Sequence, residues 1–104
     1  MDLELEDDGY PSEETLKSIA DVKVNTYTDC IALLQAIRPI WQFADAGYWA
    51  QVGDTFLVST AGWSGNESIV DALQQNHMFW ALCWESSRRG GHYTFKVNVD
   101  ALAR

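Results

Sequence analysis

The spacing of apolar residues predicts two helices at the start of the chain. Ser12 can cap a short first helix, because its side-chain oxygen can accept from a free N–H group of the first turn. A second, longer helix is capped by Thr28 or Asp29, and Pro39 kinks it or ends its regular part, since proline lacks an N–H. Residues 22–27 alternate, which favours either a short edge strand or an extended linker. The apolar positions with helical period in the second helix are Cys30, Leu33, Leu34, Ile37, Ile40, Trp41 and Ala44.

Two strand pairs are predicted further along the chain. Residues 48–52 and 55–59 form the first pair, joined by a tight turn at Gly53-Asp54. The nearly continuous apolar run over residues 78–84 predicts a central strand that is covered on both faces. Its partner over residues 92–99 alternates cleanly, and Gly90-Gly91 provides the positive φ angles of the connecting turn. The side chains expected on one face of this last strand are Tyr93, Phe95, Val97 and Val99.

These elements predict an α+β fold with an antiparallel sheet of about four strands and two to three helices. The third helix lies between the strand pairs: Ser64 and Glu67 have the spacing of a capping box, and the helix ends near Asn76. The expected order is α-α-β-β-α-β-β, with helices on at least one face of the sheet. A chain of 104 residues suits one domain, which we assign to residues 11–104 after a leader of residues 1–10.

The net charge of −8 is concentrated at the start of the chain. The acidic residues there are Asp2, Glu4, Glu6, Asp7, Asp8, Glu13 and Glu14, and the remaining chain is close to neutral. Such a leader is typical of a solvated, flexible tail, and an alternative is an acidic segment that competes with nucleic acid for a basic partner. Direct binding to DNA is disfavoured, because no basic face is present to release counterions.

Composition points to a cytoplasmic protein. Neither a signal peptide nor an apolar run long enough to cross a membrane is present. Cys30 and Cys83 each lie in an apolar run, so two buried free thiols are expected, and their spacing does not suit a metal site. We expect no cofactor. Five tryptophans exceed what a small core needs, so some are expected at a pocket or a partner surface, and a homodimer would also cover them.

The most distinctive motif runs from Gly62 to Glu67. Free N–H groups at a helix start, with glycine allowing close approach, can bind an anion, and Trp63 could stack on a base. The alternative is a self-capped helix in which Ser64 and Glu67 use those groups. The members of this candidate site are Trp63, Ser64, Gly65, Asn66 and Glu67.

A second candidate is the hairpin tip at residues 86–92. Arg88, Arg89 and His92 could clamp a phosphate or a partner's carboxylate, whereas a solvated tip would carry the same charges without binding anything. If this tip folds near Trp63 and Ser64, the combination would form a pocket for a nucleotide or another phosphorylated ligand.

Catalysis has weak support. The glycine spacing around Ser64 does not match a nucleophile elbow, and His77 and His92 have no recognisable orienting acid. Cys83, beside Trp84 in an apolar run, is better explained by packing than by reactivity. We therefore expect a protein without enzymatic activity.

The chain also resembles a group of small bacteriophage proteins that are usually described only as hypothetical. The resemblance covers about residues 54–97 and rests on GWSGNE at 62–67, ALQ at 72–74, FW at 79–80 and WESSRRGGHY at 84–93. It implies an accessory phage product that acts inside a bacterial cell, and it assigns no catalytic residue. Together with the composition, it favours a protein that binds a host or phage partner, such as a defence or regulatory factor. The alternative is a binder of a phosphate-bearing small ligand at Ser64, Arg88, Arg89 and His92. We add Trp84 to the candidate binding residues.

Overall fold

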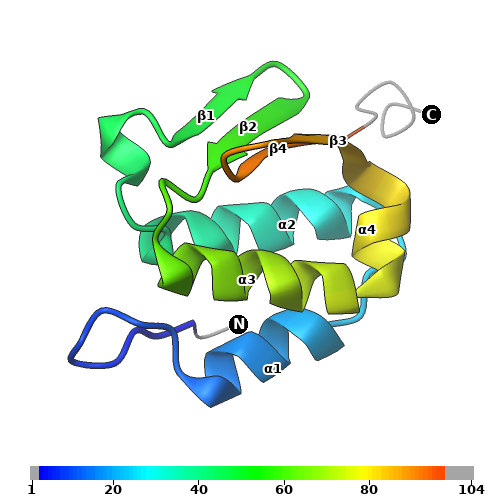
Figure 1. Ribbon diagram of the computed structural model, residues 1–104. Helices are drawn as coiled ribbons and strands as arrows, with labels where there is room; N and C mark the ends of the chain where they lie inside the picture. The colour runs from blue at the N-terminus through cyan, green and yellow to red at the C-terminus, as the bar shows by residue number, and fades with distance from the viewer. Residues whose placement is uncertain (1–2, 98–104) are drawn as a thin grey trace.

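Four strands and four α-helices form the part of the chain that the computed structural model describes, residues 3–97 (Figure 1). In chain order the elements are α1 (Glu13–Asp21), α2 (Tyr27–Ile37), the 3-10 turns η1 (Arg38–Ile40) and η2 (Ala44–Ala46), β1 (Trp49–Val52), β2 (Thr55–Ser59), α3 (Ser64–Gln75), α4 (His77–Cys83), β3 (Trp84–Arg88) and β4 (His92–Lys96). None of these helices has the length and apolar character needed to cross a membrane.

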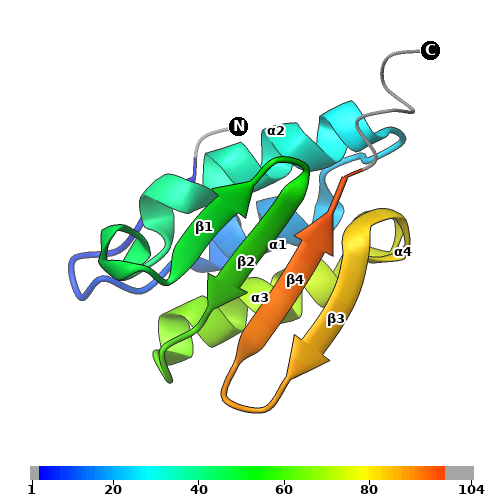
Figure 2. The same ribbon diagram turned by 90° about the horizontal axis from the view of Figure 1, so that it is seen from above.

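The strands form one antiparallel sheet in the order β1-β2-β4-β3 (Figure 2). Within residues 3–97, each outer strand pairs with its hairpin partner alone. In the centre β2 pairs with β4, with Phe56 opposite Phe95. The predicted α+β class and four-stranded antiparallel sheet are therefore confirmed. The predicted number and order of helices differ from the structure, because α4 was not foreseen.

The helices all lie on one side of the sheet. In Figure 1, α2 and α3 run beneath the strands, and α1 packs against α3 farther from the sheet. The core between sheet and helices contains Phe56 and Phe95 from the strands and Phe79 from α4, all of them fully buried. Figure 2 looks onto the opposite face of the sheet, and no described helix covers it. The candidate functional site lies on this open face.

The predicted central strand at residues 78–84 is wrong. Residues 77–83 form α4, and the strand begins only at Trp84, at the edge of the sheet. A short apolar run does not distinguish a buried strand from a buried helix. Asn76 favours the helix by capping its start, because its side-chain oxygen accepts from Phe79 N at 3.2 Å. Its amide nitrogen also donates to Ile19 O and Val22 O, both at 3.0 Å, and so fixes the cap against the end of α1.

The first two helices begin and end for reasons that were partly predicted. Ser12 caps α1 by accepting from Thr15 N, and Pro39 lies in the 3-10 turn directly after α2, as predicted. The cap of α2 is Thr26, which forms a reciprocal capping box with Asp29, so the predicted caps at residues 28 and 29 are wrong. Backbone N–H groups, first that of Asn25, hold the pKa of Asp29 below its ordinary value.

The acidic leader makes specific contacts that its composition did not predict. Leu5 pairs with Pro11 in an antiparallel bridge, and Glu6 N donates to Tyr10 O across the turn. Thr15 of α1 holds the leader segment in place, because its hydroxyl accepts from Glu4 N at 2.9 Å and donates to Glu4 O at 3.0 Å. Residues 3–11 thus fold back onto α1 and bring Tyr10 to the start of α3.

Candidate functional site

The predicted helix-start motif at Gly62 to Glu67 binds the chain's own leader. Trp63 is the residue before α3, and its ring lies 4.8 Å from that of Tyr10. Ser64 is already inside the helix and donates its hydroxyl to the Tyr10 oxygen at 2.9 Å. The predicted capping box is therefore wrong: no side chain caps α3, and Glu67 N donates to the carbonyl of Trp63 as an ordinary helical bond.

Gly65 and Asn66 serve the packing of this motif. A Cβ atom at Gly65 would lie 2.6 Å from the indole nitrogen of Trp63, so the absence of a side chain lets the indole lie across the helix. Asn66 has an exposed fraction of 0 % and connects two loops. It accepts from Gln42 N at 3.0 Å and donates to Gln42 O at 3.1 Å and to Thr60 O at 3.4 Å. Both N–H donors of Asn66 and one acceptor position of its oxygen are used inside the protein, and burial keeps the side chain out of contact with a ligand.

The hairpin tip does come close to the loop before α3. Thr60 N donates to Gly91 O at 3.0 Å, and the Thr60 hydroxyl occupies the space that a Cβ atom at Gly91 would need. Gly90 and Gly91 have φ angles of 92° and 77°, as the predicted turn requires. The backbone of the tip therefore lies beside the loop. The predicted site residues do not meet, because Trp63 and Ser64 contact Tyr10 whereas Arg88 and His92 lie on the open side of the sheet.

Arg88 and His92 face each other across β3 and β4 on the open side of the sheet. They border a hollow of about 240 Å³ that Tyr48 and Leu57 line on the other side. Trp63 and Ser64 do not line this hollow, so the predicted shared pocket does not form. Arg89 lies in the exposed turn, and Glu67 is exposed on α3.

Tyr48 and Leu57 were missed as candidates, although one signal was available. Leu57 occupies the position of β2 between the buried Phe56 and Val58, which predicts that it faces solvent. Tyr48 precedes β1, and its place beside the hollow follows from the turn at η2, whose backbone enters through Phe43 at a positive φ of 64°. Such a turn is not visible in a hydrophobic pattern.

The open face combines apolar and basic side chains. Alternation along the strands places Val52 and Leu57 on it, with exposed fractions of 67 % and 45 %. The same register places Arg88, His92 and Lys96 on it. The other paired strand residues on this face, which together with those above we call its ladder positions, are Ala50, Thr55, Ser59, Ser86 and Thr94.

Trp84 lies at the junction of α4 and β3 and belongs to the helix side of the sheet, because its register partner is the buried Phe95. It is 42 % exposed, and its ring stacks on that of Trp80 at 5.9 Å with an interplanar angle of 15°. Its indole N–H donates to the Ser87 hydroxyl at 2.8 Å. Of the five tryptophans, Trp84 is the one with the exposed apolar surface that the composition predicted.

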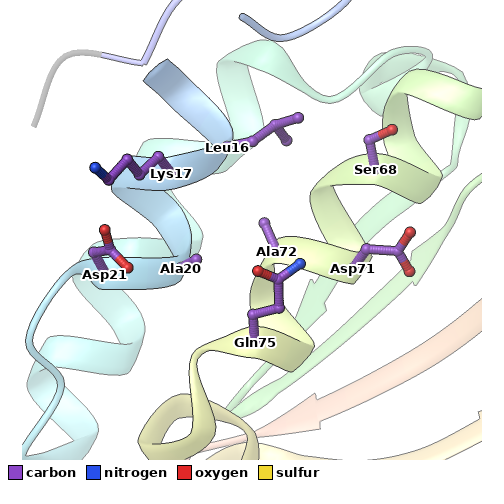
Figure 3. A pocket seen from close by; sticks show the side chains of 8 residues that line it. All are labelled: Leu16, Lys17, Ala20, Asp21, Ser68, Asp71, Ala72 and Gln75. Carbon is purple, nitrogen blue, oxygen red and sulfur yellow. The ribbon is translucent and has the colours of Figure 1, made fainter. Parts of the chain in front are cut away.

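A larger hollow of about 450 Å³ lies between α1 and α3 (Figure 3). Leu16, Ala20 and Ala72 lie between the two helices, while Lys17 and Asp71 point away from each other on the outer sides. The small alanine side chains explain the hollow, because they leave a gap where two helices pack. Its one hydroxyl, that of Ser68, donates to Ser64 O within α3 at 3.0 Å and contacts no carboxylate of the described chain, so we assign the hollow no chemistry.

The described residues contain no group of three or more side chains that could hold a metal ion. Cys30 on α2 and Cys83 on α4 are both buried, and the thiol of Cys83 donates to Phe79 O at 3.4 Å. The neighbouring Cys30 thiol, followed by burial, raises the pKa of Cys83 above its ordinary value, which disfavours a reactive thiolate at that residue.

Comparison of the chain with models of known protein families gave no match. Searches of curated proteins and of solved structures gave none either. The open face of the sheet and its chemistry are therefore the basis for assigning a function.

Proposed function

We propose that this protein is a small phage accessory protein that binds a protein partner in the bacterial host, without enzymatic activity, through the open face of its sheet. The phage origin rests on the sequence resemblance around residues 62–93. The observation that carries the proposal is the exposure of Leu57 on the central strand β2 and of Val52 at the end of the outer strand β1, on a sheet face that no described helix covers. Exposed apolar side chains that adjoin one another mark interaction surfaces, because burying them on a partner is favourable.

The surroundings of these two residues extend the apolar area. Tyr48 lies across the hollow from Arg88, and its ring contacts that of Phe43 at 6.2 Å in an edge-to-face arrangement. Phe43 is itself 52 % exposed. Aromatic and arginine side chains with a polar rim are the composition that protein interfaces favour.

A phosphate-bearing small ligand is the second candidate, and the geometry supports it less. The hollow that Arg88 and His92 border has a volume of about 240 Å³, below the roughly 300–1,000 Å³ of ordinary ligand pockets. The sequence predicts a phosphate site at the start of α3, but Tyr10 contacts Trp63 and Ser64 there.

Site-specific photo-crosslinking in bacterial cells tests the proposal. A photoreactive phenylalanine analogue replaces Leu57 on the open face, or Glu14 on α1 at the other side of the molecule as the control. We expect a defined crosslinked protein from position 57 and none from position 14. The captured protein is then purified, and Leu57→Asp should weaken its binding by about tenfold or more.

Other results would contradict the proposal. Equal products from both positions would indicate nonspecific contact, and no product from position 57 would leave the open face without a partner. A product of twice the chain's own mass would show that a second copy of the chain binds the open face. The protein would then form a homodimer through this face, and the proposal of a host partner there would be wrong.

A further inference from the structure

We infer that the open face recognises an acidic surface of its partner, with an Asp or Glu side chain entering the hollow between Tyr48 and the pair Arg88–His92. This inference rests on the proposed function and adds the chemistry of the partner. It is drawn from the distribution of charge, the pairing of the basic side chains and the shape of the hollow.

The charge of the open face is opposite to that of the whole chain, so the expectation from the sequence that no basic face is present is wrong. The chain has 15 acidic and 7 basic residues, yet the ladder positions of the open face hold Arg88, His92 and Lys96 and no acidic residue. Glu85 lies in the irregular stretch of β3, and Asp54 lies in the turn before β2. A face of one sign on a protein of the other sign selects partners by complementarity.

Within residues 3–97 the basic groups of this face have no carboxylate partner. Among residues 3–97 the one ion pair joins Arg38 and Asp45, at 3.2 Å. Arg88 therefore has no carboxylate of the described chain within ion-pair distance. It also lies directly opposite His92 on β4. A carboxylate that enters between these two side chains would accept hydrogen bonds from both.

The shape of the hollow suits one side chain. Leu57 and Tyr48 supply apolar walls, while the hydroxyls of Ser59 and Thr94 lie along the same lining as Arg88 and His92. The volume of about 240 Å³ accommodates an acidic side chain and its apolar stem more readily than a nucleotide. Apolar contact provides affinity, and the guanidinium provides selection for a carboxylate.

Nuclear magnetic resonance with defined probes tests this chemistry on the full chain. The probes are the capped tripeptide acetyl-Glu-Leu-Glu-amide, its uncharged counterpart acetyl-Gln-Leu-Gln-amide, and inorganic phosphate. We expect the Glu peptide to shift the backbone amide signals of residues 57, 88 and 92 at low salt, and the Gln peptide to leave them unchanged. Added salt should weaken the effect, because exposed charges are screened.

Matched variants assign the effect to the open face. Arg88→Glu should weaken binding of the Glu peptide by about tenfold or more, whereas Lys17→Glu, which changes an exposed charge on α1 by the same amount, should not. Equal shifts with the Gln peptide would overturn the inference. So would shifts confined to other surfaces, or a response to phosphate without one to the Glu peptide.

The crosslinking experiment separates the inference from the proposed function. If Arg88→Glu leaves the crosslinked product at position 57 unchanged, the partner binds there without charge selection, and only the inference fails. If the Glu peptide binds at the hollow but position 57 yields no crosslinked product in cells, the partner proposal fails and the chemistry of the face stands.

Discussion

Replacement of Asn66 by alanine should destabilise the protein strongly, although the sequence placed this residue in a ligand site. The side chain is fully buried and holds both the N–H and the carbonyl of Gln42, at 3.0 and 3.1 Å. Alanine would leave these groups without partners in a site too enclosed for easy solvation. A buried unsatisfied group costs about 1–3 kcal/mol, so we expect Asn66→Ala to lower the free energy of unfolding by about 2–4 kcal/mol.

The assay is urea unfolding followed by tryptophan fluorescence, with Gln74→Ala as the control. Gln74 is exposed on the same helix, so its replacement should change stability by less than about 0.5 kcal/mol. With a urea slope of about 1–2 kcal/mol per molar, Asn66→Ala should lower the midpoint by roughly 1–4 M. A loss no larger than that of the control would refute the structural role of Asn66.

The isosteric change Asn66→Asp adds a test of sign. The introduced carboxyl would face the carbonyl oxygens of Gln42 and Thr60, so burial and these dipoles raise its pKa in the folded state above the unfolded value of about 3.9. Protonated, it can donate one hydrogen bond; ionised, it repels both oxygens. The loss in free energy of unfolding of Asn66→Asp relative to the native chain should therefore be smallest below about pH 4. It should grow as pH rises through the folded-state pKa. A deficit that does not vary with pH would contradict this account.

Two further predictions concern the turn and the thiols. Gly91→Ala should cost about 1–2 kcal/mol more than Gly53→Ala in urea unfolding: both residues have positive φ, but only at Gly91 would the new Cβ overlap a neighbour, the Thr60 hydroxyl. Equal costs would contradict the contact between the hairpin tip and that loop. Cys30 and Cys83 should react slowly with a thiol reagent in the native protein at pH 8 and completely in urea, because both are buried and the pKa of Cys83 is raised. Fast labelling of the native protein would show that the two helices open readily.

The strands were predictable because their signals are local. Alternation in residues 92–97, with Phe95 and Val97 buried and Lys96 exposed, carries its own face assignment, and glycine pairs with positive φ mark the turn. The described residues confirm this pattern up to Val97; Asn98 and Val99 lie outside them. The helix α4 was not predictable in the same way, because the apolar run of residues 78–84 has no period and its cap at Asn76 also serves as a link to Val22.

The candidate site was predictable only in part, because its members depend on tertiary contacts. Arg88 and His92 could be placed on one face from the hairpin alone, since they flank the turn and pair across it. Their partner on the far side of the hollow, Tyr48, comes from another hairpin, and the pairing of β2 with β4 decides that it lies there. No spacing in the sequence encodes that pairing.

The two predicted motifs lie beside the same loop and still have separate roles. Thr60 contacts the hairpin tip through Gly91, and three residues later Trp63 turns toward Tyr10, away from the open face. Changes at Trp63 or Asn66 should therefore act on stability, because these side chains hold loops and leader together. Changes at Arg88 should act on partner binding with little effect on stability, since this side chain is exposed and has no ion-pair partner in the described chain. A partner-binding defect that persists in an Asn66 variant after folding is restored at low temperature would place the helix start in the interface as well.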